Sequence, residues 1–143
     1  MPSLLFVYGS LKQGFVNEHV NTGRRVAGQY RTLARYPMVL LGEGDVPCLI
    51  AQPGTGYQVI GEVYETNAGD IARMDKLERL GEPEGYERVE VDIERFDLQP
   101  AQTVRAFVYM KQPHTIAADT PRSEPLAEYK AEHAVRFRWT GAA

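Results

Sequence analysis

The sequence predicts a single α+β domain built mostly of β-strands, with one strong helix inserted late. Three observations support this fold class. The length of 143 residues fits one domain of ordinary size. Short runs with β-sheet character recur along most of the chain, and Asn67–Leu80 has helical periodicity. This order favours a mixed or barrel-like sheet over a doubly wound sheet, in which strands and helices would alternate.

The predicted strands are short runs bounded by glycine and proline. Leu4–Tyr8 is continuous and apolar and ends at Gly9, which is typical of a buried first strand. A short helix is expected next, over Phe15–Val20. The following strands are expected over 26–33, 36–41, 47–51 and 57–66.

The predicted helix has signals at both ends. Asn67 is a favourable N-cap residue, and Asp70 three positions later is close to a capping-box arrangement. Gly81 and Pro83 are expected to stop the helix after Leu80. Two more strands are expected over 86–96 and 103–110, because apolar side chains occupy alternate positions in both.

The pattern weakens after residue 112, where prolines interrupt it. Ser123 is a candidate cap for a short helix through Pro125–Ala134. Phe137 and Trp139 are large apolar residues in a polar tail, so we expect them to pack on the main body.

Composition argues against several classes of protein. The net charge of −3 gives no electrostatic reason to expect nucleic acid or an anionic membrane as a partner. No run approaches the roughly 18 apolar residues of a membrane span, and Met1–Ser3 lacks the basic start of a signal peptide. Cys48 is the single cysteine and lies in an apolar run, so we expect a core residue rather than a reactive thiol. A cytoplasmic protein is the expectation.

A search for reactive groups gives mostly absences. The histidines His19, His114 and His133 are far apart in sequence, so no metal site is expected. The chain contains no P-loop motif, and the sequence around Ser10 lacks the Gly-x-Ser-x-Gly spacing of a nucleophile elbow.

Two features remain as candidates for a site. The first is Tyr8-Gly9-Ser10-Leu11 at the end of the first strand. Consecutive backbone amides at such a turn can converge on a carboxylate or an oxyanion. The alternative is a plain turn that ends the strand.

The second candidate is Glu78. On a helix, Ile71, Met74 and Leu77 define an apolar stripe, and Glu78 lies on the same stripe. A carboxylate that faces a core is unfavourable unless it has a partner or lines a cavity. Burial would raise its pKa and make it a general base near neutral pH. The alternative is a glutamate at the edge of the core, paired with an arginine.

Five short motifs, taken in order, resemble the γ-glutamylcyclotransferase-like family, which includes γ-glutamylamine cyclotransferases and AIG2-like proteins. They are Tyr8-Gly9-Ser10-Leu11, Gly61-Glu62-Val63-Tyr64, Asp75-Lys76-Leu77-Glu78, Tyr86-Glu87-Arg88 and Phe107-Val108-Tyr109. Two dipeptides, Tyr36-Pro37 and Val46-Pro47, are similar to positions of the γ-glutamylamine branch. The resemblance covers a core of about 4–110 within one domain over 1–143, and leaves a C-terminal extension of about 111–143.

The resemblance implies a compact mixed β-barrel with flanking helices and a pocket at one mouth. It also implies a reaction on a small-molecule γ-glutamyl amine or peptide. The substrate's own α-amine attacks its side-chain carbonyl, which releases 5-oxoproline and a free amine. Since ring closure is intramolecular, the resemblance implies no metal and no cofactor.

The resemblance also implies a role for each site residue. Glu78 would act as the acid–base group. The backbone amides of Gly9, Ser10 and Leu11 would hold the α-carboxylate or the developing oxyanion. The pocket would be lined by the rings of Tyr8, Tyr86 and Tyr109.

Two other classes of function stay open. A small-molecule binding protein would keep the same pocket without turnover, although the intact Glu78 favours an enzyme. An interaction module would use the β-surface instead and would expose an apolar patch.

Overall fold

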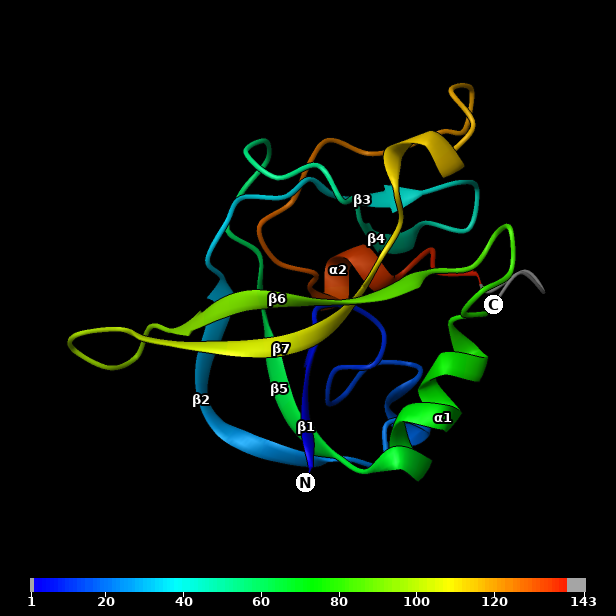
Figure 1. Cartoon of the computed structure of the whole chain (residues 1–143). Coiled ribbons are helices and arrows are strands. Elements are labelled where there is room, and N and C mark those ends of the chain that lie inside the picture. Colours follow the sequence, from blue (N-terminus) through cyan, green and yellow to red (C-terminus); the bar gives the residue numbers. More distant parts are fainter. Residues whose placement is uncertain (1, 139–143) are drawn as a thin grey trace.

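Five strands close into a barrel in the order β1-β5-β2-β6-β7 (Figure 1). The computed structural model describes residues 2–138. The barrel strands are β1 (Ser3–Val7), β2 (Arg24–Thr32), β5 (Ile60–Thr66), β6 (Glu87–Arg95) and β7 (Gln102–Met110). β1 is antiparallel to β5 and parallel to β7, so the sheet is mixed and its two edges pair with each other. The predicted α+β class and the barrel are confirmed.

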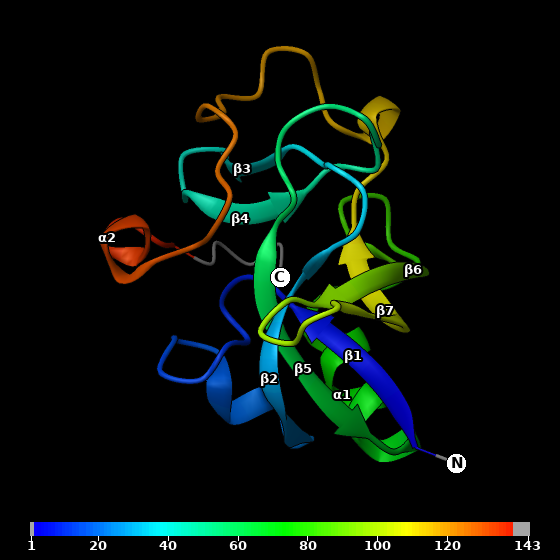
Figure 2. The ribbon, with the colours of Figure 1, turned by 90° about the vertical axis from the view of Figure 1, so that its left-hand side faces the viewer.

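A two-stranded sheet covers one end of the barrel. It consists of β3 (Met38–Leu41) and β4 (Val46–Leu49), which pair antiparallel. Figures 1 and 2 show this sheet at the end toward which β1 runs. Short 3-10 turns occupy Glu18–Val20 and Pro113–Thr115. No helix in the described part of the chain is long and apolar enough to cross a membrane.

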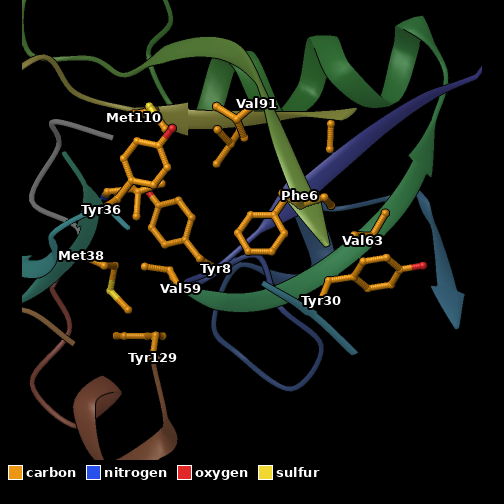
Figure 3. Packing of buried hydrophobic residues seen from close by; sticks show 14 residues of the cluster. Phe6, Tyr8, Tyr30, Tyr36, Met38, Val59, Val63, Val91, Met110 and Tyr129 are labelled. Carbon is orange, nitrogen blue, oxygen red and sulfur yellow. The ribbon is translucent and has the colours of Figure 1, made fainter. Parts of the chain in front are cut away.

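Alternating side chains fill the barrel, as the sequence predicts for its last two strands. Val91 and Ile93 of β6 are buried, as are Ala106 and Val108 of β7. Figure 3 shows part of this core, including Phe6, Tyr8, Val59 and Val63. Cys48 is fully buried, so its prediction as a core residue is confirmed.

The helix α1 (Ala68–Leu77) begins as predicted. The Asp70 amide donates to the Asn67 side chain at 2.8 Å, and the Asn67 amide donates to the Asp70 carboxylate at 2.9 Å. These two hydrogen bonds form a complete capping box.

The predicted end of this helix at Leu80 is wrong, because α1 stops at Leu77. Arg79 adopts a left-handed φ of 54°. Its amide donates to the Lys76 carbonyl at 3.2 Å, and the Leu80 amide donates to the Asp75 carbonyl at 3.0 Å. This is a Schellman motif with arginine at the position where glycine is usual, at a conformational cost of about 1 kcal/mol.

The two other predicted helices are also shorter than expected. Only Glu18–Val20 of the first is helical, as a 3-10 turn. The predicted cap at Ser123 is wrong, because its amide donates to the Leu40 carbonyl of β3 and its hydroxyl accepts from the Leu40 amide. These hydrogen bonds hold the segment extended, and α2 is limited to Ala131–Ala134.

The tail returns to the end of the barrel that carries β3 and β4. The Leu126 amide donates to the Met38 carbonyl at 2.8 Å. Phe137 is partly buried, and the Arg138 amide donates to the Gly44 carbonyl at 2.7 Å. Trp139 lies outside the described residues.

Candidate active site

One pocket brings together all the site residues predicted from the sequence. It lies where β1 ends and encloses about 360 Å³, with the open space at its mouth included. Its wall contains Tyr8, Gly9, Ser10, Leu11, Glu78, Tyr86 and Tyr109. Phe6 and Val7 of β1 and Val46 and Pro47 of β4 also line the pocket and were not predicted as site residues. The barrel therefore collects in one place residues from its first strand, its helix and its last strand.

Glu78 is a buried carboxylate that accepts no hydrogen bond from residues 2–138. It is the C-cap residue of α1, and only 8% of it is exposed. No group within residues 2–138 donates to its carboxylate, and no arginine in that range pairs with it, so the arginine-paired alternative is wrong. Burial raises the pKa of Glu78 to about 8, and the positive charge of Lys111 opposes this rise. A group with that pKa can both accept and donate a proton near neutral pH.

A second carboxylate lies one helical turn before Glu78, in a different environment. Asp75 accepts a hydrogen bond from the Tyr109 hydroxyl at 2.7 Å and forms an ion pair with Arg88. Within residues 2–138, Asp75 therefore has an ion-pair partner and Glu78 does not. Neighbouring carboxylates whose environments differ in this way can have different roles in one active site.

The loop after β1 lines the pocket and carries backbone amides that have no protein acceptor within residues 2–138. Within residues 2–138, the amides of Gly9, Ser10 and Leu11 donate to no other protein group. The loop is a turn, in which the Lys12 amide donates to the Gly9 carbonyl at 3.0 Å. Asn17 fixes it, since its side chain donates to the Ser10 hydroxyl at 2.9 Å. Successive free amides of this kind form a site for an anion.

Glycine at position 9 is required by close packing against β4. A Cβ atom there would lie 2.7 Å from Cγ of Pro47. We expect Gly9→Ala to lower the free energy of unfolding by about 1–3 kcal/mol, because the loop or Pro47 must move. Urea unfolding measures this effect.

Gly69→Ala is the matched control for this substitution. A Cβ atom at Gly69 would meet nothing closer than 3.4 Å, and the residue lies in the first turn of α1. Alanine there is expected to be neutral or to stabilise by up to about 1 kcal/mol. Equal stabilities for wild type and Gly9→Ala would contradict the packing argument.

The hydroxyl groups of the three pocket tyrosines all donate to protein acceptors. Tyr8 donates to the Tyr109 carbonyl at 2.8 Å, Tyr86 to the Pro47 carbonyl at 2.9 Å, and Tyr109 to Asp75. Burial raises the pKa of each phenol well above 10, so all three stay neutral. The Tyr8 oxygen also accepts from the Leu49 amide at 3.0 Å. The three tyrosines therefore offer a ligand mainly their rings.

The Gly61-Glu62-Val63-Tyr64 motif supports the loop from β5. The Glu62 carboxylate accepts from the Gln13 amide at 2.9 Å and from the Tyr64 hydroxyl at 2.9 Å. It also forms an ion pair with Arg25 at 3.4 Å. Sequence reasoning gave this motif no structural role, although its charged residue within a strand was a signal.

The other reactive groups near the pocket are inert. Burial raises the pKa of the Cys48 thiol to about 12, so it stays protonated. Among residues 2–138, no three side chains of histidine, cysteine, aspartate or glutamate are arranged to hold a metal ion.

The sequence is similar to those of several known proteins. The family model described as gamma-glutamyl cyclotransferase, AIG2-like, matches residues 5–131. A putative gamma-glutamylcyclotransferase of Drosophila melanogaster is 31% identical over 115 residues, which are 77% of this chain and 70% of that protein. The human gamma-glutamylaminecyclotransferase is 34% identical over 124 residues, or 76% of this chain and 78% of that protein.

The fold is also similar to that of a solved structure. The crystal structure of an AIG2-like protein from Mus musculus superposes with a TM-score of 0.81 at 28% identity. The superposition covers 98% of this chain and 97% of the mouse chain. It therefore includes the tail that the sequence motifs left unmatched.

Proposed function

The chain belongs to the gamma-glutamyl cyclotransferase, AIG2-like family, and from this membership we propose that it cyclises a γ-glutamyl amine or peptide. The products are 5-oxoproline and the free amine. One observation carries the proposal: a buried, unpaired carboxylate shares a small pocket with three free backbone amides. The amides suit the negative charges of a γ-glutamyl group, and the carboxylate suits its α-ammonium.

Glu78 moves the protons in the proposed reaction. As a carboxylate it removes a proton from the substrate's α-ammonium, and the freed amine attacks the γ-carbonyl carbon. The new nitrogen–carbon bond produces a tetrahedral oxyanion. The protonated Glu78 then donates to the leaving nitrogen, and the bond between that nitrogen and the carbonyl carbon breaks. The ring nitrogen passes its second proton to the departing amine, which leaves as an ammonium ion. No water is consumed, and the carboxylate is regenerated.

The rest of the pocket positions the substrate. Amides of the Gly9–Leu11 loop hold the α-carboxylate or the oxyanion. The rings of Tyr8, Tyr86 and Tyr109 enclose the glutamyl group, since their hydroxyl protons are donated to protein acceptors and the Tyr8 oxygen already accepts from the Leu49 amide. Holding amine and carbonyl in contact supplies most of the rate gain in an intramolecular reaction.

The proposal is tested by measuring 5-oxoproline release from purified protein. The panel contains γ-glutamyl-ε-lysine, γ-glutamyl dipeptides and glutathione. We expect release, in equal amounts with free amine, from at least one of them. Calorimetric binding of the same compounds is the parallel measurement. Binding without release would contradict the proposal and favour a binding protein with the same pocket.

A further inference from the structure

A second hollow continues from the reaction pocket. The two share Val46 and Tyr86 in their walls. Tyr86 therefore borders both hollows, whereas Glu78 lines only the first. A substrate whose glutamyl group fills the first pocket would extend its amine half past Tyr86.

The charged residues that line the second hollow differ in how deeply they are buried. Glu43, Glu84 and Arg138 are exposed, at its rim. Lys111 is partly buried and lies closest to the junction, with Nζ 4.9 Å from the centre of the Tyr86 ring. Its positive charge is also felt by Glu78, which places it near the reacting end of the substrate.

Lys111 is a cation with spare hydrogen-bonding capacity. Its Nζ donates to the Glu84 main-chain carbonyl at 2.8 Å, and within residues 2–138 it forms no ion pair. An ammonium group has three donors, so two stay available. Its main chain is fixed, because the Lys111 amide donates to the Leu49 carbonyl and its carbonyl accepts from the Ala51 amide.

We propose that the second hollow binds the amine half of the substrate and that Lys111 recognises a carboxylate on it. This inference rests on the proposed function and narrows its substrate class. The preferred leaving group is an amino acid or peptide amine with a free carboxylate, rather than a simple alkylamine or a diamine. A charge-assisted hydrogen bond from a partly buried ammonium gives the selectivity.

Two substrates that differ by one carboxylate test the proposal. They are the γ-glutamyl amides of the lysine ε-amine and of 1,5-diaminopentane. The leaving nitrogens have the same alkyl surroundings, and both compounds carry a second ammonium group. We expect wild-type kcat/KM to be about tenfold higher for the lysine compound. We expect Lys111→Met to reduce this ratio to about one.

The ratio separates recognition from other effects of Lys111. Any effect of the variant on Glu78 changes kcat/KM for both substrates by the same factor and therefore cancels in their ratio. Lys76→Met is the matched control, because Lys76 lies exposed on α1 and lines neither hollow. It is expected to keep the wild-type ratio. Equal kcat/KM for the two substrates in wild type, or an unchanged ratio in Lys111→Met, would overturn the inference.

Binding measurements keep the two proposals distinguishable. Calorimetry on Glu78→Gln gives a Kd for each of the two compounds in the absence of turnover. Tighter binding of the lysine compound that disappears in Glu78→Gln/Lys111→Met supports the carboxylate site even if wild type releases no 5-oxoproline. Equal Kd values for both compounds contradict it.

Discussion

Glu78→Gln is expected to lower kcat/KM for 5-oxoproline release by about 10²- to 10⁴-fold, the usual contribution of a general acid–base group. Glutamine has nearly the same shape but cannot take the proton from the attacking amine or return one to the leaving amine. The pocket keeps its form, because the Glu78 carboxylate makes no hydrogen bond within residues 2–138. Assays on purified wild type and variant at matched concentration measure the loss.

Glu82→Gln is the matched control for this experiment. Glu82 lies four residues later, is exposed, and has only a distant ion pair with Arg79 at 4.0 Å. The same chemical change there is expected to leave turnover unaltered. Turnover near that of wild type in a folded Glu78→Gln protein would show that another group moves the protons.

The same substitution is expected to make the protein more stable at alkaline pH. The pKa of Glu78 is raised from 4.5 to about 8 in the folded protein. Between these values the folded state keeps a proton that the unfolded chain has released. The unfolding free energy of wild type therefore falls as pH rises through this window, by about 1.4 kcal/mol per pH unit. The favourable contribution is complete below pH 4.5 and lost above about pH 8.

Glutamine does not titrate, so the unfolding free energy of Glu78→Gln does not fall across this pH window as that of wild type does. The gap in unfolding free energy between the variant and wild type should widen with pH, by up to about 5 kcal/mol across the whole window. Urea unfolding at several pH values from 5 to 9 measures the gap, with Glu82→Gln beside it. A gap independent of pH would contradict a buried, proton-binding Glu78.

These opposite effects on activity and stability have one cause. The Glu78 carboxylate lacks both a hydrogen-bond donor and an arginine partner within residues 2–138, unlike Asp75 with its Arg88 and Tyr109. A partner would stabilise the fold and also lower the pKa of the base. Under the proposed mechanism, the site keeps a group that is unfavourable for folding because proton transfer requires it.

Local patterns in the sequence predicted most of the fold and identified the candidate site residues. Alternation identified β6 and β7, and the spacing from Met74 to Glu78 placed that carboxylate toward the interior. The early helix end was not predictable, because Arg79 adopts a conformation that favours glycine. No propensity rule marks an arginine for that role.

Contacts between distant parts of the chain account for the rest. The Ser123 amide and hydroxyl form hydrogen bonds with the main chain of Leu40, 83 residues away in sequence. Ser123 therefore pairs with a strand instead of capping a helix as its local sequence had predicted. Lys111 follows β7 and lines the second hollow, and nothing in the sequence connects it with Glu78. Pro47 is a wall residue for the same reason, because β4 is folded over the end of β1.

The loop that holds the three free amides depends on residues made much later during synthesis. The Tyr8 hydroxyl donates to the carbonyl of Tyr109, 101 positions on, and the buried Lys12 ammonium donates to the carbonyl of Tyr129, 117 positions on. A growing chain exposes its first strand early, but that loop stays without its anchors until Tyr129 has emerged. Ordering of the loop is therefore expected to follow these long chain closures. A nascent chain cannot form all the contacts of the candidate pocket before Tyr129 has been made.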